Sequence, residues 1–435
     1  MPKITFMGAG STIFAKNVLG DSIMTPALAE STLALYDIDA ERLEESRTML
    51  EAINRNNGAK ARIETYLGIP KRKDALHDAD YVINAIQVGL YDPCTITDFE
   101  IPKKYGLRQT IADTLGIGGI FRALRTIPVM LDFARDMEVA CPNAWFLNYS
   151  NPMAMLTGAM LHMTPIKTVG LCHSVQVCAE HLLQGLGLPF DRQVQWKIAG
   201  INHQAWLLEI SRNGVDLYPE IKARAAARAE MHDDMVRYEI MKRFGYYVTE
   251  SSEHNAEYMP YFIKNKYPEL IERFNIPLDE YPRRCVEQIK GWKERGHELT
   301  QNPNLTHERT NEYASYIMEA IETNHPFVFG GNVLNTGLIP NLPNGCVVEV
   351  SCVADKGGIT PCYAGPLPEQ CAAMNRSNVN VHLLTLEASR TLKKDYIYQA
   401  AMMDPHTAAE LSIDDIVAMC DDLIAAHGDW LPKFS

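Results

Sequence analysis

The chain has 435 residues, with 54 acidic against 41 basic side chains and a formal net charge of −13. A surface of this charge repels nucleic-acid phosphates and anionic lipid, so we expect neither nucleic acid nor a membrane as a partner. The length predicts two packed domains. We expect no membrane-spanning helix and no signal peptide, because no apolar run is long enough and the first strand begins at once.

Short apolar runs alternate with helical stretches over the first part of the chain. Runs of four to six apolar residues between helices are typical of a parallel sheet that is covered on both faces. Residues 1–195 are therefore predicted to form a Rossmann-like, doubly wound dinucleotide-binding domain. Its strands are predicted at 4–7, 33–36, 81–85, 144–148 and 168–171, and its helices at 11–19, 40–54 and 75–79.

The pattern changes beyond this part, where helices and short strands mix without the same alternation. One helix is predicted over 221–244, a strand over 346–350 and a terminal helix over 412–427. Residues 196–435 are predicted to form an α+β second domain that closes over the first and carries substrate and oligomer contacts. The whole follows the plan of lactate and malate dehydrogenases.

Ten cysteines are dispersed along the chain and form no CxxC pair. A chain of this length needs no disulfide scaffold, so this usage predicts a reducing, cytoplasmic location. Most thiols are then expected to be small buried apolar groups. A cysteine with a chemical role is expected to be a metal ligand or a nucleophile.

A glycine turn follows the first predicted strand. In a dinucleotide fold, Gly8 permits the tight turn and Gly10 lets the backbone approach the pyrophosphate. Asp37 ends the second strand, where a carboxylate accepts from a ribose hydroxyl and disfavours a 2′-phosphate, so NAD is predicted over NADP. The usual third glycine is replaced by Ile13. An ordinary glycine turn in an α/β sheet is the alternative interpretation.

Three further polar residues are candidates for the same cofactor. Ser11 and Thr12 follow the glycines and can bind phosphate or cap the helix. Asn84 ends a later strand, where it can line the cofactor cleft, although an ordinary strand-to-loop connection explains it equally well.

Candidate metal ligands follow the last predicted strand of the sheet. Cys172 and His173 lie at the carboxyl end of a parallel strand, the edge at which α/β folds bind ligands, and His203 is a second imidazole further on. Thiolate and imidazole suit Zn²⁺ or a similar ion, and Mn²⁺ when oxygen ligands are added. Two protein ligands leave coordination positions for substrate and water. A buried inert thiol and a satisfied core histidine are the alternative.

Three stretches have a polar composition that suits a sugar pocket. Residues 148–152 place two amides after a strand, residues 109–125 form a glycine loop with Asp113 before a helix, and residues 250–262 mix ionisable and aromatic side chains. Solvated connecting loops are the alternative interpretation.

Five of these segments occur in the order that is typical of one enzyme family. The chain resembles the NAD- and metal-dependent glycosidases of glycoside hydrolase family four, and its Cys-His-Ser-Val segment resembles the α-galactosidase branch. The phosphoglucosidase branches carry Asp or Asn where this chain has His173. The segments are 8–12, 148–152, 172–175, 200–203 and 257–261.

The resemblance implies hydrolysis of small α-galactosides, such as melibiose or raffinose, through redox steps. NAD⁺ takes a hydride from C3, a base removes the C2 proton, and Mn²⁺ or another divalent cation stabilises the resulting enediolate. The glycosidic oxygen then leaves, water adds to C1, and the hydride returns.

The resemblance also implies roles for individual residues. Cys172 and His203 correspond to the metal ligands. Tyr258 corresponds to the base, with a pKa lowered by the cation, and Tyr261 is the alternative. His173 is the expected general acid because imidazole titrates near neutral pH, with Asp113 as the alternative.

Substrate and partner contacts follow from the same resemblance. Asn148 and Asn151 are expected to orient substrate and nicotinamide, and Arg284 is expected to reach a substrate hydroxyl, with a surface ion pair as an equal alternative. A homodimer or homotetramer is implied.

Other functions fit parts of this pattern. An α-glucosidase or uronidase of the same family would share every motif. A net NAD-dependent dehydrogenase would share the fold but would release NADH and need no Cys-His metal pair. A non-catalytic NAD sensor would bind the cofactor without turnover.

Overall fold

The protein is described by a computed structural model of residues 1–435, apart from the side chain of Arg295. Its N-terminal half contains six parallel strands in the spatial order β3-β2-β1-β4-β5-β6. This order is doubly wound, as predicted from the sequence, although β3 was not among the predicted strands, and its topological switch point lies between β1 and β4. The strands are β1 (Lys3–Met7), β2 (Thr32–Asp37), β3 (Arg62–Leu67), β4 (Tyr81–Asn84), β5 (Trp145–Asn148) and β6 (Lys167–Gly170).

Helices follow the strands of this half, as the alternating pattern predicted. The carboxylate of Asp39 caps α2 by accepting from the N–H groups of Glu41 and Arg42, which explains where that helix begins. The helices are α1 (Thr12–Met24), α2 (Ala40–Asn56), η1 (Ile69–Lys71), α3 (Arg72–Leu76), η2 (Leu90–Thr95), α4 (Ile96–Lys104), α5 (Gly116–Ala140), α6 (Met153–Met163) and α7 (His173–Gly185).

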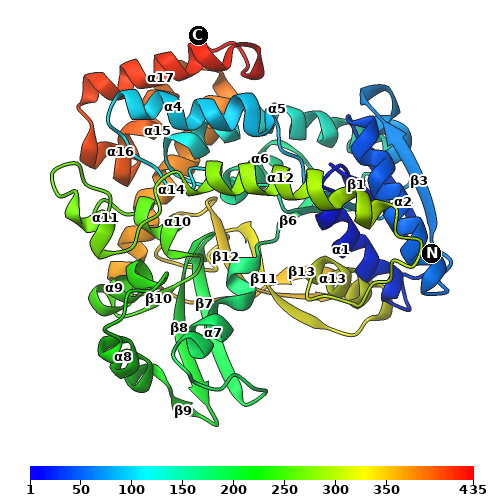
Figure 1. The fold of residues 1–435 in the computed structure, drawn as a ribbon, viewed down its shortest axis with the longest axis horizontal. Helices are drawn as coiled ribbons and strands as arrows, with labels where there is room; N and C mark the ends of the chain where they lie inside the picture. Colours follow the sequence, from blue (N-terminus) through cyan, green and yellow to red (C-terminus); the bar gives the residue numbers. More distant parts are fainter.

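The sheet continues into the C-terminal half through antiparallel strands. β11 joins β6 at the pair Asn332 and Gly170, and β12 joins β7 at the pair Glu349 and Gly200. A ribbon of β7, β8 and β9 extends away from the C-terminal helices (Figure 1). The strands are β7 (Val194–Ile201), β8 (Gln204–Arg212), β9 (Val215–Asp216), β10 (Tyr247–Val248), β11 (Phe327–Leu334), β12 (Val347–Asp355) and β13 (Gly358–Pro361).

The predicted single helix over 221–244 is wrong, because two helices form there. Arg228 adopts an extended conformation after the first helix, and Asp234 begins the second, where its carboxylate pairs with Arg237. The helices of this half are α8 (Tyr218–Ala227), α9 (Met235–Phe244), α10 (Ser252–Glu257), α11 (Glu269–Arg273), α12 (Glu280–Thr300), α13 (Tyr313–Thr323), α14 (Glu369–Thr391), α15 (Lys394–Met403), α16 (Pro405–Glu410), α17 (Ile413–His427) and η3 (Gly428–Trp430).

The hydrophobic core is shared between the two halves. One cluster joins Phe6 of β1 to Val350 of β12, and a second joins Phe121 of α5 to Leu423 of α17. The domain boundary at residues 195 and 196 stays a prediction. Within the described part of the chain, all ten cysteines are free thiols, and nine of them are buried. Among the described residues, no helix combines the length and apolar character that a membrane crossing requires.

Candidate active site

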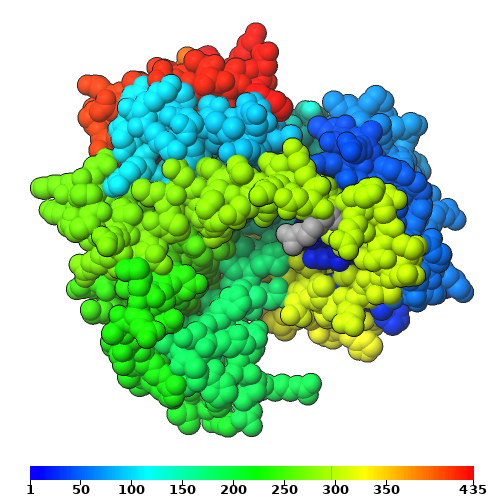
Figure 2. Space-filling model, in the orientation of Figure 1, coloured from blue at the N-terminus to red at the C-terminus, as the bar shows by residue number. Residues whose placement is uncertain are grey.

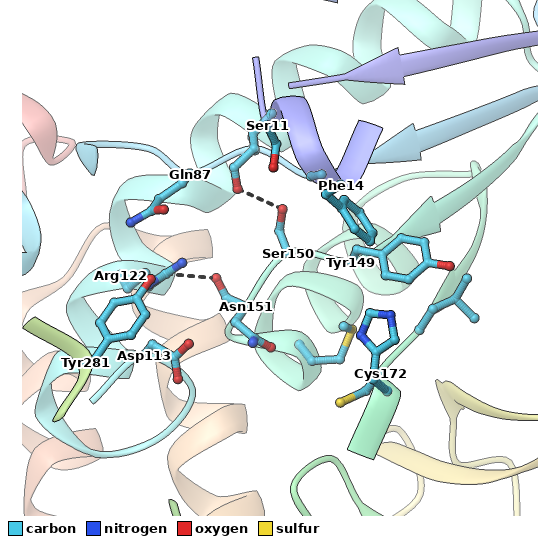
Figure 3. A pocket seen from close by; sticks show the side chains of 15 residues that line it. Ser11, Phe14, Gln87, Asp113, Arg122, Tyr149, Ser150, Asn151, Cys172 and Tyr281 are labelled. Carbon is cyan, nitrogen blue, oxygen red and sulfur yellow. Dashed lines mark hydrogen bonds between the residues drawn. The ribbon is translucent and has the colours of Figure 1, made fainter. Parts of the chain in front are cut away.

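A cavity of about 320 Å³ opens at the carboxyl ends of β1, β4, β5 and β6. Its wall includes Ser11, which follows the glycine turn, and the predicted metal ligand Cys172 (Figure 3). In Figure 2 this face of the molecule is hollowed beneath α12, next to the dark-blue start of the chain. The lining residues are Ser11, Phe14, Ala85, Ile86, Gln87, Asp113, Arg122, Tyr149, Ser150, Asn151, Met153, Leu171, Cys172, His173 and Tyr281.

The glycine turn has the geometry that a dinucleotide site requires. Gly8 has a φ of +88°, and a Cβ added to it would lie 2.9 Å from the carbonyl oxygen of Ala85. The N–H of Gly10 donates to the carboxylate of Asp37 at 2.6 Å, and an added Cβ would lie 2.8 Å from the same carboxylate. Only glycine fits at Gly8, and a Cβ at Gly10 would displace the Asp37 carboxylate, so glycine at both positions keeps the turn tight.

The polar residues beside the turn differ in what they can contact. Ser11 is exposed, lines the cavity and makes no capping bond through its side chain within the described chain, so it is free to bind phosphate at the start of α1. Thr12 is buried, and its hydroxyl donates to the carbonyl oxygen of Gly10 at 3.2 Å. Thr12 therefore stabilises the turn from within.

Asn84 and Asn148 lie behind the cavity wall, although both were predicted to contact ligand directly. The Asn84 amide donates to the side-chain oxygens of Asn148 at 2.9 Å and Ser150 at 3.2 Å. Asn148 in turn donates to the carbonyl of Ser150 and the hydroxyl of Thr157. Both side chains are fully buried at the ends of adjacent strands, so they position the 149–151 segment rather than face the cavity.

Asn151 does face the cavity, whereas Arg284 does not. The Oδ1 atom of Asn151 is buried and has no hydrogen-bond partner among the described residues, so it is available to a ligand (Figure 3). Arg284 pairs with Glu280 and Glu253, its side chain is 40% exposed, and it lies outside the lining. The surface ion-pair interpretation of Arg284 fits this geometry.

Arg122 was missed in the sequence and lines the cavity instead. Its Nε donates to the carbonyl of Asn151 at 3.2 Å, and its Nη1 donates to the hydroxyl of Tyr281 at 3.1 Å. Because α5 carries three arginines, the sequence gives no signal that singles out Arg122 for this role.

Three potential metal ligands converge beside the cavity. The Sγ of Cys172, a ring nitrogen of His203 and a carboxylate oxygen of Glu250 all lie within 4.8 Å of one another. Cys172 follows β6, His203 lies in the turn between β7 and β8, and Glu250 follows β10. His203 and Glu250 both have a φ of +62°, the left-handed region that non-glycine residues occupy at constrained sites.

The donor set fits a divalent cation. The predicted pair of Cys172 and His203 supplies soft and borderline ligands, and the unpredicted Glu250 adds the oxygen ligand that Mn²⁺ favours. Burial raises the pKa of the Cys172 thiol to about 12, and the carboxylates of Glu349 and Glu250 add to this effect. A cation is therefore needed to hold the thiolate, and metal binding releases its proton.

Tyr258 lies against the metal-ligand cluster and is fully buried. Its hydroxyl oxygen is 3.0 Å from the Nδ1 of His203. Burial raises the pKa of Tyr258 well above its ordinary value, and the carboxylates of Asp113 and Glu257 add to this. The buried setting therefore opposes the predicted lowering of the pKa of Tyr258, whereas the hydrogen bond with Thr114 and a nearby cation act in the required direction.

The two candidate acids occupy different settings. Asp113 is buried, accepts from the hydroxyl of Thr114 at 2.9 Å, and lies 3.7 Å from the Nε2 of His254. Burial alone raises the pKa of Asp113, but the nearby His254 imidazole and the charge of Arg122 outweigh it and hold the pKa below its ordinary value.

His173 points toward the outer edge of the cavity. Its Nε2 lies 2.8 Å from a carboxylate oxygen of Glu312, and its side chain is 50% exposed. Its ring packs near those of Phe14, Tyr149 and Tyr313. His173 thus lines the same cavity as Asp113 but is held by a carboxylate on its far side.

Comparisons with known proteins match this chain to one family over nearly its whole length. The "Family 4 glycosyl hydrolase" profile covers residues 3–188, and the "Family 4 glycosyl hydrolase C-terminal domain" profile covers residues 198–407. The chain belongs to the family 4 glycosyl hydrolases. The sequence-based assignment of the family and of a glycoside hydrolase activity is therefore confirmed.

This family 4 glycosyl hydrolase has similar relatives of named activity. An alpha-galactosidase of Bacillus subtilis is 65% identical over 435 residues, covering 100% of both chains. Among solved structures, the putative glucosidase lplD from Bacillus subtilis has a TM-score of 0.85 at 24% identity and covers 97% of this chain and 99% of its own. A 6-phospho-alpha-glucosidase from gut microorganisms, solved with NAD and Mn²⁺, has a TM-score of 0.80 at 19% identity over the full length of both chains. These structures confirm the predicted α/β fold.

Proposed function

We propose that this enzyme is an α-galactosidase that hydrolyses small, non-phosphorylated α-galactosides such as melibiose or raffinose with the help of NAD⁺ and Mn²⁺ or another divalent cation. One observation carries the proposal: a glycine turn built for a dinucleotide and a ligand set that fits Mn²⁺ reach the same cavity, the first through Ser11 and the second through Cys172. The 65% identity to an alpha-galactosidase supports the choice of sugar.

The two cofactors have distinct protein contacts in this proposal. The tight turn at Gly8 and Gly10 brings the pyrophosphate to the start of α1, where Ser11 binds it, and Asp37 accepts from the ribose. Cys172, His203 and Glu250 hold the cation. When bound, NAD⁺ supplies a hydride acceptor for the sugar C3 and the cation supplies a Lewis acid for the oxygens at C2 and C3.

Tyr258 acts as the base that takes the C2 proton. Its oxygen lies against His203, so a proton removed there is removed beside the position of the cation. A carbonyl at C3 acidifies the C2 proton, and a phenolate at this buried position is stabilised by the adjacent positive charge.

Asp113 gives a proton to the departing glycosidic oxygen, with His173 as the alternative donor. The lowered pKa of Asp113 keeps its carboxylate ionised, so the proton that it passes to the glycosidic oxygen comes from His254, whose Nε2 lies 3.7 Å away. Asp113 lines the cavity next to Asn151 and Arg122. Asn151 orients the sugar through its unpartnered Oδ1. The overall reaction is hydrolysis, with no net oxidation of the sugar.

Cleavage of two chromogenic sugars tests the proposal. We expect hydrolysis of p-nitrophenyl α-galactoside in the presence of NAD⁺, Mn²⁺ and a thiol, and loss of activity when any of the three is omitted. A preference for p-nitrophenyl α-glucoside would support the proposed reaction but contradict galactose as the sugar. Steady accumulation of NADH at 340 nm would instead favour a net dehydrogenase.

A cytoplasmic location and a homodimer or homotetramer belong to the same proposal. Nine buried free thiols support a reducing compartment. Light scattering of the purified protein measures the assembly state directly.

A further inference from the structure

The carboxylate of Glu257 binds three consecutive backbone N–H groups of another segment. It accepts from Thr110 at 2.7 Å, from Ile111 at 3.2 Å and from Ala112 at 2.6 Å. Glu257 is the last residue of α10 and is 3% exposed. It immediately precedes Tyr258, and the segment that it holds immediately precedes Asp113. This one side chain therefore links the backbones that carry both residues.

Residues 110–112, the segment that Glu257 holds, have a second contact with α10 and an unfavourable backbone conformation. The hydroxyl of Thr110 donates to the carbonyl of Glu253, also in α10, at 2.7 Å. Ala112 has a φ of +48°, a left-handed conformation that costs energy for a residue with a Cβ. Such a conformation persists only where surrounding contacts impose it, and the bond to its own N–H is the shortest that Glu257 accepts.

Glu257 is 3% exposed and its carboxylate is taken up by three backbone N–H groups, so it is not available to bind a sugar. Burying a carboxylate is costly, and hydrogen bonds to its charged form offset that cost. A residue whose hydrogen bonds all lead to the backbone before Asp113 acts through that backbone. We propose that Glu257 is a positioning residue that fixes Asp113 relative to Tyr258, and this inference rests on the proton-transfer roles given under the proposed function.

The proposal predicts which side chains can replace Glu257. Three converging donors need a group that only accepts, and glutamine presents an NH₂ group to at least one of them. Aspartate is shorter by one methylene, so its carboxylate cannot reach the segment without movement of α10. A misplacement of about 1 Å at a reacting group can cost on the order of 100-fold in rate.

Amide hydrogen exchange of the substrate-free protein tests the contact itself. We expect faster exchange of the Thr110, Ile111 and Ala112 amides in Glu257→Gln than in wild type. Asp404→Asn is the matched control, because Asp404 is a fully buried carboxylate that accepts from the N–H of Thr407 at the start of α16. Unchanged exchange at 110–112 in Glu257→Gln, or equal acceleration there in the control, would overturn the proposal.

Kinetics then test whether the contact positions Asp113. We expect Glu257→Gln to lower kcat on p-nitrophenyl α-galactoside by about 10- to 100-fold, with KM and NAD⁺ affinity changed less than about threefold. In the double variant Glu257→Gln, Asp113→Asn, kcat should be little lower than in Asp113→Asn alone, because the two substitutions disable one group. An unchanged kcat, or fully multiplicative losses, would contradict the positioning role. Inactivity of the wild type would contradict the proposed function alone, since the exchange result stands without substrate.

Discussion

The Nδ1 nitrogen of His203 lies 3.0 Å from the phenolic oxygen of Tyr258, while its Nε2 nitrogen lies 3.3 Å from a carboxylate oxygen of Glu250. If Nε2 ligates a cation, Nδ1 carries the proton and donates it to the tyrosine oxygen. The imidazole then holds the metal on one side and favours a phenolate on the other. Metal binding and activation of the base are thereby linked through one ring.

Replacing Tyr258 by phenylalanine tests the assignment of the base. We expect the α-galactosidase kcat to fall by at least about 100-fold, because a general base contributes at least that much. Tyr261→Phe is the matched control, since Tyr261 lies three residues on and is 52% exposed. Equal activity of Tyr258→Phe and wild type in a steady-state assay would remove Tyr258 from the mechanism.

Replacing Cys172 by serine tests the metal site. We expect tight Mn²⁺ binding and activity to be lost while NAD⁺ still binds, because serine supplies no thiolate and the glycine turn is untouched. Binding is measured by electron paramagnetic resonance of Mn²⁺ and by titration with NAD⁺. Cys178→Ala, which removes the buried thiol on α7, should retain both ligands. Full Mn²⁺ affinity in Cys172→Ser would refute the assignment.

Replacing Gly10 by alanine tests the cofactor site. The added Cβ would lie 2.8 Å from the Asp37 carboxylate and displace it from the Gly10 N–H, so we expect NAD⁺ affinity to fall by about tenfold or more. Gly185→Ala is the control, because its added Cβ meets only the Tyr238 hydroxyl at 3.7 Å. Equal NAD⁺ dissociation constants for the two variants would contradict the predicted site.

Comparing two acid variants separates Asp113 from His173. We expect Asp113→Asn to lose far more activity on melibiose than on p-nitrophenyl α-galactoside, because an activated leaving group needs less help from an acid. His173→Gln should affect both substrates similarly, since its imidazole is held by Glu312 at the cavity edge. The reverse pattern would assign the acid role to His173.

The buried His382 on α14 predicts an acid-dependent loss of stability. Burial lowers the pKa of His382 to about 4, against about 6.5 in the unfolded chain. The unfolded state therefore binds the proton first, and stability present above pH 6.5 is lost as the pH falls toward 4, at about 1.4 kcal/mol per pH unit. In urea unfolding, the free energy of unfolding of His382→Gln should rise relative to that of wild type by this amount for each pH unit below 6.5. Parallel stability curves would contradict a neutral buried imidazole.

The parallel half of the fold was predictable because its signals are local. Apolar runs such as 81–84 are buried on both faces in the sheet, and the glycine turn follows β1 where the pattern placed it. Cys172 was also predictable, since a ligand at the carboxyl end of a parallel strand is a property of the fold class. The helix break between α8 and α9 was not, because the segment between them has a helix-favouring composition.

The remaining site residues could not be predicted, because their roles arise only in three dimensions. Glu250 joins Cys172 and His203 from a separate element, and no fixed spacing connects the three. Glu257 contacts a segment that lies 145 to 147 residues earlier in the chain. Asn148 has the composition of a ligand-binding residue, but a buried partner network takes up its amide.

Deuterium at C2 of the released sugar is the most direct test of the account. Turnover of an α-galactoside in deuterated water, with NAD⁺ and Mn²⁺ present, should give galactose that carries deuterium at C2, because Tyr258 removes that proton and a solvent-derived one replaces it. Galactose incubated with the enzyme alone controls for exchange after release, and mass spectrometry reads the label. Hydrolysis at an unchanged rate with no deuterium at C2 would contradict proton removal at C2 and the role of Tyr258.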